Sequence, residues 1–288
     1  MNRPASNHTV SSKVLFGIVL VLLSAVFLAT QNVISRLFFV PGDLFGRSRI
    51  GGWLPSQFSN IVMLLSLRMA LMAGLLASVA PRLYPKTFST LQQLKQHRQL
   101  LSCVIGSGSC LFVGLTALYF ALSQVAAGIA IATFFIYPAI TLLLAWRFLQ
   151  QPPRTYQLGL MPVIFLGVVL TTQDVDTSAA LSTNPALGII GGLIAGLSFG
   201  LYGIFAEIAL QPSSSNESNS KNKQQNHRQP LYPVPFSLIT FIVVSALGGL
   251  SLLLMPPVQV SASAWQPTLI TTLFSALITV TAYVLNNF

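Results

Sequence analysis

Long apolar runs alternate with short polar stretches along the whole chain. Eight runs approach or exceed the roughly 20 mostly apolar residues that a helix needs to cross a bilayer. They cover residues 14–35, 58–80, 100–122, 126–149, 156–172, 186–210, 234–255 and 267–285. The fifth is the shortest, and the eighth reaches almost to the last residue, Phe288. The pattern predicts an all-α integral membrane protein with about eight transmembrane helices.

The composition argues against a soluble fold. Of the 288 residues, 53% are hydrophobic and 7% are charged, whereas soluble domains carry about 25% charged residues. Residues 230–288 contain no Asp, Glu, Lys or Arg. A net charge of +10 would suggest a nucleic-acid partner in a soluble protein. Here the basic residues lie in loops between apolar runs, so we expect the lipid bilayer as partner and no nucleic acid.

Basic residues gather on one side of the predicted membrane. If residues 1–13 are cytoplasmic, the inner side holds eleven of them: Arg3, Lys13, Arg82, Lys86, Lys95, Arg98, Arg147, Arg154, Lys221, Lys223 and Arg228. The outer side holds three: Arg36, Arg47 and Arg49. Because basic loops stay in the cytoplasm, the bias predicts a cytoplasmic N-terminus. The membrane is expected to be a bacterial-type plasma (inner) membrane. A cleaved signal peptide is the alternative for residues 14–35, but no small-residue cleavage site follows them.

Two polar stretches interrupt the apolar pattern. Residues 41–57 are predicted to lie outside, along the membrane interface, where Phe45, Trp53 and the arginines are at home. Residues 211–229 have no aliphatic or aromatic side chain and are predicted to be disordered. They belong to a predicted polar cytoplasmic linker at residues 211–233.

The apolar segments show a weak internal repeat. The first and sixth segments align at an offset of 171, which pairs Gly17 with Gly188 and Arg36 with Glu207, and the third and eighth align at about 168. A first repeat of five helices is predicted at 14–172 and a second at 186–288. Because five is an odd number, the second repeat would be inverted, an arrangement common in transporters. If the repeat is real, a ninth and a tenth helix are expected beyond Phe288.

Residues 117–153 read ALYFALSQVAAGIAIATFFIYPAITLLLAWRFLQQPP. The Tyr-Phe-Ala-Leu stretch, the turn of small residues, the apolar helix with an internal Pro and the Leu-Leu-Ala-Trp end resemble the EamA-like branch of the drug/metabolite transporter superfamily. The sequence SLRMAL around Arg68 is similar to the family's second helix. The resemblance implies ten helices in two inverted repeats of five, with both termini inside. Gln150 and Gln151 stand where family members often carry a Glu.

Arg68 is a charged residue near the middle of the second apolar segment. A central Arg costs about 2.5–3.5 kcal/mol on insertion scales, so it should face the bundle interior or a water-filled cavity. It is either an anchor for an anionic or carbonyl-bearing substrate, or a structural residue that is bound to helix-end carbonyls or snorkels toward the interface. Tyr119, in the third segment, is a further candidate for substrate binding.

Other polar side chains lie in the first and sixth segments. Gln31 and Asn32 are candidates for hydrogen bonds to substrate, and the repeat places Tyr202 opposite Gln31. Such groups also hold helices together. Glu207 is a candidate for ion or proton coupling, with a side chain that merely reaches the headgroups as the alternative.

Pro138 is predicted to kink the fourth helix, because a mid-helix Pro removes one backbone hydrogen bond. The Phe134 carbonyl that loses this bond could line a cavity, with Thr133 and Tyr137 as pore-facing candidates. A kink that serves packing alone is the alternative. In the sixth segment, Gly188, Gly192, Gly196 and Gly200 share one helix face. Small residues at this spacing predict close helix packing.

The function that these features favour is secondary transport, as export or exchange of a small metabolite or drug-like solute by alternating access. The chain has no G-x-x-x-x-G-K-[ST] motif, so energy would come from a solute or ion gradient. The alternatives are a non-transporting membrane protein or inactive fragment, and an enzyme embedded in the membrane. An enzyme would need a cluster of His, Asp, Glu or Cys in or near the membrane, and the sequence has too few of these residues. We expect no cofactor and no metal. Cys103 and Cys110 are interpreted as apolar fillers, and a homodimer is left open.

Overall fold

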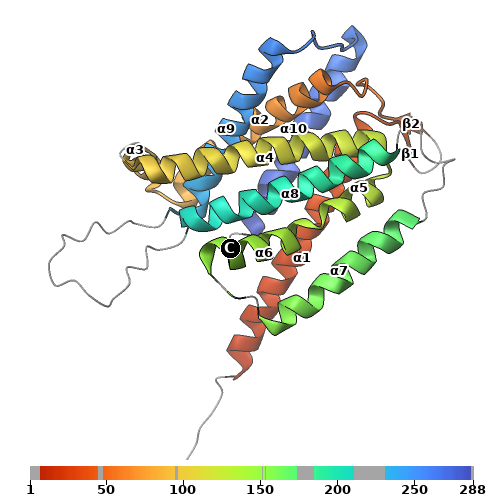
Figure 1. Ribbon diagram of the computed structural model, residues 1–288. Helices are drawn as coiled ribbons and strands as arrows, with labels where there is room; N and C mark the ends of the chain where they lie inside the picture. Colours follow the sequence, from red (N-terminus) through yellow and green to blue (C-terminus); the bar gives the residue numbers. More distant parts are fainter. Residues whose placement is uncertain are drawn as a thin grey trace, which may run out of the picture. The chain divides into compact units, whose positions relative to one another are not determined.

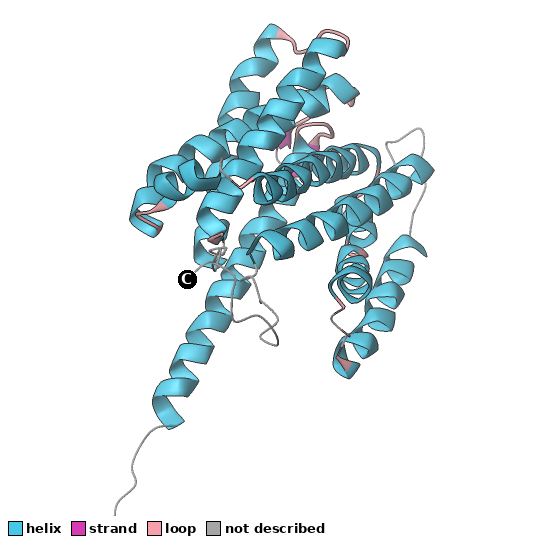
Figure 2. Ribbon diagram, turned by 60° about the vertical axis from the view of Figure 1, so that its left-hand side comes forward, coloured by secondary structure: helices cyan, strands magenta, loops and turns pink. Residues whose placement is uncertain are grey.

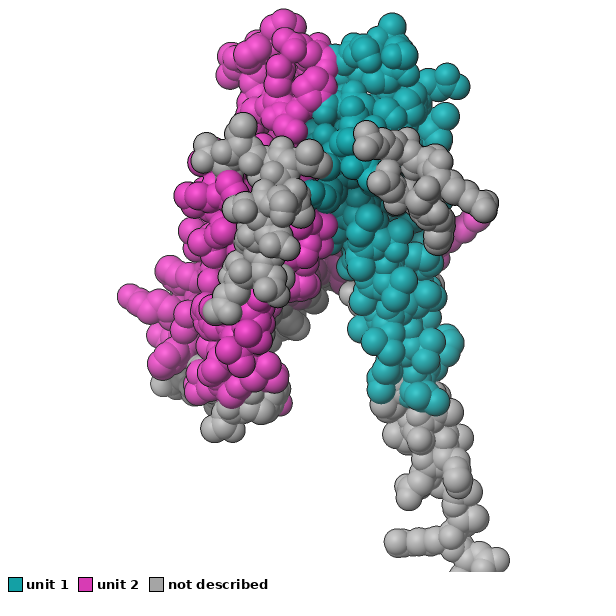
Figure 3. Space-filling view, turned by 90° about the vertical axis from the view of Figure 1, so that its right-hand side faces the viewer, with its two compact units in different colours: residues 1–54, 260–288 teal, residues 55–259 magenta. Residues whose placement is uncertain are grey.

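The structure, a computed structural model, describes residues 7–44, 48–94, 97–150, 152, 154–173, 185–210 and 231–286. Helices make up almost all of it, with one small pair of strands (Figures 1 and 2). The chain divides into two compact units (Figure 3). Unit 1 combines Met1–Leu54 with Val260–Phe288, and unit 2 is Pro55–Gln259. The predicted disordered stretch, 211–229, lies outside the described residues.

Seven helical spans in the described chain are long and apolar enough to cross a membrane. They are α1 (Asn7–Leu37), α2 (Phe58–Leu83), α4 (Arg98–Gln124), the run Ala127–Leu149 that contains α5 and α6, α8 (Pro185–Leu210), α9 (Pro233–Leu254) and α10 (Ala262–Asn286). The fifth predicted segment forms α7 (Thr155–Gln173), whose described apolar stretch, Gln157–Gly167, is shorter than a span. The prediction of an all-α integral membrane protein is confirmed.

Large apolar side chains cover much of the outer surface. Leu253 and Leu254 are 80% and 87% exposed, and Phe148 and Phe16 are 67% and 64% exposed. Extended apolar surfaces of this kind mark contact with a membrane or another protein. On helices of membrane-spanning length, the surroundings that suit such side chains are lipid tails.

In unit 1, α1 packs against α10, and a short hairpin follows α1. Its strands, β1 (Gly42–Leu44) and β2 (Ser48–Ile50), pair antiparallel with Gly42 opposite Ile50. The chain then turns through Gly51 and Gly52, whose φ angles of 104° and 70° favour glycine. A Cβ at Gly51 would collide with the Leu37 carbonyl oxygen, which accepts a hydrogen bond from the Gly52 N–H at 2.8 Å.

The sequence did not predict this hairpin, since its strands are only three residues long. Trp53, expected at the membrane interface, contacts Phe38 edge to face with ring centroids 6.0 Å apart. Phe45 lies outside the described residues. The loop is therefore tied back to the end of α1 both by backbone hydrogen bonds and by an aromatic contact.

In unit 2, α4 lies along α8 over most of its length and also packs against α9 (Figure 1). The two helices α2 and α9 form a second extensive contact. The helices α5 (Ala127–Phe134) and α6 (Tyr137–Leu149) both pack against α8, and α5 also contacts α7. Thus α8 is the element that joins α4 to the α5–α6 pair.

Asn60, near the start of α2, holds the loop that follows α9. Its side chain is fully buried, and its Nδ2 donates to the carbonyl oxygens of Pro55 at 3.0 Å and Gln259 at 3.2 Å. The Gln259 N–H in turn donates to Asn60 Oδ1 at 3.1 Å. A buried amide with both ends hydrogen-bonded stabilises its surroundings. Asn60 therefore fixes the ends of α2 and α9 to each other.

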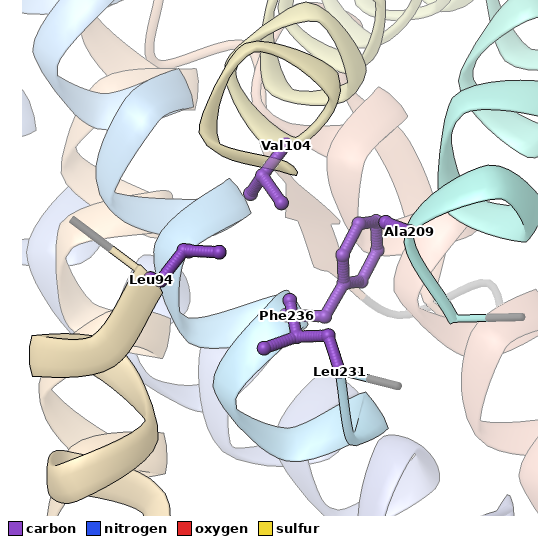
Figure 4. Close-up of a cluster of buried hydrophobic side chains, with 5 residues drawn as sticks. All are labelled: Leu94, Val104, Ala209, Leu231 and Phe236. Atoms are coloured by element: carbon purple, nitrogen blue, oxygen red, sulfur yellow. The ribbon is translucent and has the colours of Figure 1, made fainter. Parts of the chain in front are cut away.

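A small apolar cluster lies at the other end of α9 (Figure 4). It contains Leu94 from α3 (Thr87–Leu94), Val104 from α4, Ala209 from α8, Leu231 just before α9, and Phe236 from the first turn of α9. The short helix α3 was not predicted, because its residues TFSTLQQL are mostly polar. Its burial at Leu94 explains why it forms.

Candidate functional site

The fourth membrane span is broken in its first half. The helix α5 ends at Phe134, α6 begins at Tyr137, and Phe135 and Ile136 lie between them. Pro138 occupies the first turn of α6 rather than the middle of a kinked helix. This differs from the prediction, and the reason is that the fixed φ and missing N–H of proline suit the first turn of a helix.

The break changes the hydrogen bonding of the backbone. Pro138 has no N–H, so it cannot donate to the carbonyl of Phe134 four residues earlier. The Phe135 N–H instead donates to the carbonyls of Ile131 at 2.9 Å and Ala132 at 3.1 Å. The end of α5 is thus tightened, and the Phe134 carbonyl oxygen lies close to Gly196 of α8.

The glycine face of α8 lies against this break. At Gly188, Gly192, Gly196 and Gly200 an added Cβ would come closest to, in order, Val125, Thr133, Ile136 and Ile140. At Gly196 it would lie 2.5 Å from Ile136 Cγ2 and 3.0 Å from the Phe134 carbonyl oxygen. At Gly192 it would collide with Thr133 Oγ1. No side chain larger than hydrogen fits at these positions without a shift of α5, of α6 or, at Gly188, of the end of α4.

Thr133, one of the pore-facing candidates, is buried at this contact. Its side chain is 1% exposed, and its hydroxyl donates to the carbonyls of Ile129 at 3.0 Å and Ala130 at 2.9 Å. The hydroxyl is therefore engaged within α5 in this conformation. Thr133 would have to separate from Gly192 before it could meet a solute.

Aromatic rings run from the break along α8 to α9. Phe134 stacks on Tyr137 with centroids 4.9 Å apart and meets Phe199 edge to face at 4.7 Å. Phe199 contacts Tyr202 at 6.0 Å, and Tyr202 contacts Phe236 at 6.3 Å. Two of the predicted residues, Tyr137 and Tyr202, thus belong to one row, and both are only partly buried.

Arg68 and Tyr119 meet between α2 and α4. Arg68 is 4% exposed, and its Nη1 donates a hydrogen bond to the Tyr119 hydroxyl. The guanidinium carbon lies 5.9 Å from the centroid of the Tyr119 ring, which is 1% exposed. An arginine within a membrane span faces the bundle interior or a water-filled cavity, and such residues often mark the path of a substrate or ion.

The remaining candidates lie on α1 and near the end of α8. Gln31, 5% exposed, lies on α1 in unit 1 and donates to Ser35 Oγ at 2.7 Å, within the same helix. Asn32 follows it and is partly buried. Glu207 is partly buried near the end of α8 in unit 2.

Phe134 and Phe199 were missed as candidates at the sequence level. Phe134 was considered only for its carbonyl, and Phe199 was not considered. One usable signal was the proximity of Phe199 to Gly196 and Gly200, since a bulky residue next to a glycine face borders the same contact. In the described part of the chain, no three residues among His, Cys, Asp and Glu come together, and Cys103 and Cys110 are free thiols.

Comparison with known proteins places the chain among transporters. No family model matches it, so the EamA-like resemblance stays a prediction. It is 32% identical over 275 residues to a protein of Synechocystis sp. (strain ATCC 27184 / PCC 6803 / Kazusa) that is named an uncharacterized transporter. The alignment covers 95% of this chain and 77% of that protein. The chain therefore belongs to the same family of membrane transporters as this cyanobacterial protein.

Proposed function

We propose that this protein is a secondary transporter that moves a small metabolite or drug-like solute, by export or exchange, through alternating access. The observation that carries the proposal is the broken span: α5 and α6 meet at Phe135 and Ile136, inside a run of apolar length. Interrupted helices whose backbone groups face a central path are a recurring feature of secondary transporters. The aromatic row beside the break would line the path of the solute.

The glycine face of α8 supplies a means of motion. Its contact with α5 and α6 depends on close backbone approach. Helices that touch through small residues lack interlocking side chains. The α5–α6 pair could therefore tilt on α8 at little cost, which would open the break toward one side of the membrane and then the other.

Packing within each unit supports an inverted repeat. The third helix of the first repeat, α4, packs against the first helix of the second, α8, in unit 2. In unit 1 the third helix of the second repeat, α10, packs against the first helix of the first, α1. If the two repeats are exchanged, the α4–α8 pairing becomes the α1–α10 pairing. The α2–α9 pairing stays the same, because α2 and α9 are the second helices of their repeats.

Two buried serines agree with the same offset. Ser107 on α4 and Ser275 on α10 are 168 residues apart and are 0% and 1% exposed. Neither hydroxyl has a hydrogen-bond partner within the described chain, whereas the helical Ser66 and Ser109 each donate to a carbonyl four residues earlier. Two related halves are expected to place residues at matching positions in similar environments.

With the basic loops inside, the N-terminus would be cytoplasmic.

Transport itself is testable with a panel of solutes. Cells that produce the protein should accumulate less, or release more, of at least one metabolite or drug-like solute than cells with an empty vector. Because no nucleotide motif is present, a protonophore or loss of the solute gradient should abolish the difference. Equal levels of every solute in cells where membrane insertion has been verified would count against the proposal. The Gly192→Leu variant serves as an inserted but poorly packed comparison.

A further inference from the structure

The segment that joins α2 to α4 carries concentrated positive charge. Arg82, Lys86 and Arg98 are exposed and flank α3. The sequence has no acidic residue between Asp43 and Asp174, so no carboxylate of this long stretch neutralises them. A neighbouring group that balances this charge would have to come from another helix or from outside the protein.

Aromatic and apolar side chains lie among these charges. Tyr84 stacks on Tyr232 with ring centroids 4.3 Å apart, and Tyr232 is 52% exposed. Phe88, a large apolar residue on the mostly polar helix α3, is 50% exposed. Aromatic rings beside basic groups are typical of the level of the lipid headgroups.

This surface is held in place by buried contacts. Leu94 at the end of α3 belongs to the apolar cluster with Val104 and Phe236 (Figure 4). At the start of α3, the buried Thr87 hydroxyl donates to the Tyr84 carbonyl at 2.6 Å. Both ends of α3 are therefore fixed to the helices beside it, and the exposed side chains stand on a built surface.

We propose that the α3 patch, defined as Arg82, Tyr84, Lys86, Phe88, Arg98 and Tyr232, binds the phosphate headgroups of anionic phospholipids. The basic groups would neutralise the phosphate, while Phe88 and Tyr232 would contact the glycerol and upper acyl region. A soluble phosphate would gain nothing from these rings, which is why a lipid fits the patch better. The bound headgroup would bridge the ends of α2, α4 and α9.

The orientation given by the basic loops places the patch at the cytoplasmic leaflet. Each basic residue close to an anionic surface strengthens binding about fivefold. Loss of two such residues should therefore weaken binding of an anionic lipid roughly 25-fold. A lipid without net charge should bind equally well to the unmodified protein and to a variant that lacks two basic residues of the patch.

The test compares two double variants of the full chain, each lacking two exposed basic residues of the predicted cytoplasmic side. Lys86→Gln/Arg98→Gln removes charge from the patch, and Arg147→Gln/Arg154→Gln removes the same charge elsewhere. Binding of fluorescent phosphatidylglycerol and phosphatidylcholine is measured on purified protein in neutral detergent. We expect only the patch variant to lose its preference for phosphatidylglycerol, by roughly 25-fold.

Three outcomes would overturn the proposal. An unchanged preference in the patch variant would show that the patch does not bind the headgroup. Equal losses in both double variants would show attraction to total charge rather than a site. Displacement of phosphatidylglycerol by excess inorganic phosphate would assign the patch to a soluble anion. A thermal unfolding curve for each variant verifies that the protein remains folded.

Discussion

Gly192→Leu should separate α8 from α5 and lower the free energy of unfolding by about 1–3 kcal/mol, the usual cost of overpacking. Even a single Cβ at this position would collide with Thr133 Oγ1 and would lie 2.9 Å from Thr133 Cβ. It would also approach the Ala130 carbonyl oxygen to 3.2 Å, and backbone cannot rotate away as a flexible side chain can. The measurement is the unfolding temperature of the purified protein in detergent, together with transport of the solute found in the panel.

A matched control comes from Gly249 on α9, where an added Cβ would meet no atom within 4 Å. Gly249→Ala should leave stability unchanged or raise it by about 0.5–1 kcal/mol, because alanine favours the helix. The Gly192→Ala/Thr133→Ala pair should recover part of the loss of Gly192→Ala alone, since it removes the colliding hydroxyl. If Gly192→Leu unfolded at the temperature of the unmodified protein, the close contact between α8 and α5 would be wrong.

Arg68→Ala should lower the free energy of unfolding by about 1.5–3 kcal/mol, the typical worth of a hydrogen bond to a charged group. The substitution leaves the Tyr119 hydroxyl, on a side chain that is 1% exposed, without the Arg68 donor. Tyr119→Phe should cost a similar amount, because the buried guanidinium then loses that acceptor. Unfolding temperatures of both single variants and of the double variant give the coupling between them.

The double variant should lose less than the sum of the single losses, since the two groups act on each other. Tyr84→Phe is the comparison, because the Tyr84 ring keeps its stacking on Tyr232. Additive losses would show that Arg68 and Tyr119 do not stabilise each other. If Arg68→Ala remained folded but lost transport, Arg68 would serve as an anchor for the solute; unchanged transport would leave it a structural role.

The helices could be predicted from the apolar pattern because bilayer thickness sets the length of each run. The predicted 58–80 became Phe58–Leu83, 186–210 became Pro185–Leu210, and 234–255 became Pro233–Leu254. The break at Phe135 could not be placed, since α5 and α6 are both apolar and form one continuous run. Pro138 signalled an irregularity, but whether proline kinks a helix or starts one depends on the packing around it.

Contacts between residues that are far apart in the chain could not be predicted from the sequence. Spacing alone showed that Gly192 lies on a small-residue face, but the partner, Thr133, follows from the fold. Likewise, Arg68 could be expected to face the interior, whereas its bond to Tyr119 spans 51 residues. The clamp formed by Asn60 and Gln259 spans 199 residues and involves a polar residue that no periodic pattern marks.

Alternating access requires that the break between α5 and α6 opens to each side of the membrane in turn. A cysteine at Tyr137, in a chain with Cys103→Ala and Cys110→Ala, reports this directly through a membrane-impermeant thiol reagent. Leu143→Cys in the same background is the control, because Leu143 is 50% exposed on an apolar face of α6 and should stay unlabelled. We expect Tyr137→Cys to be labelled both in right-side-out and in inside-out vesicles, whereas labelling from one side alone, or from neither, would contradict alternating access.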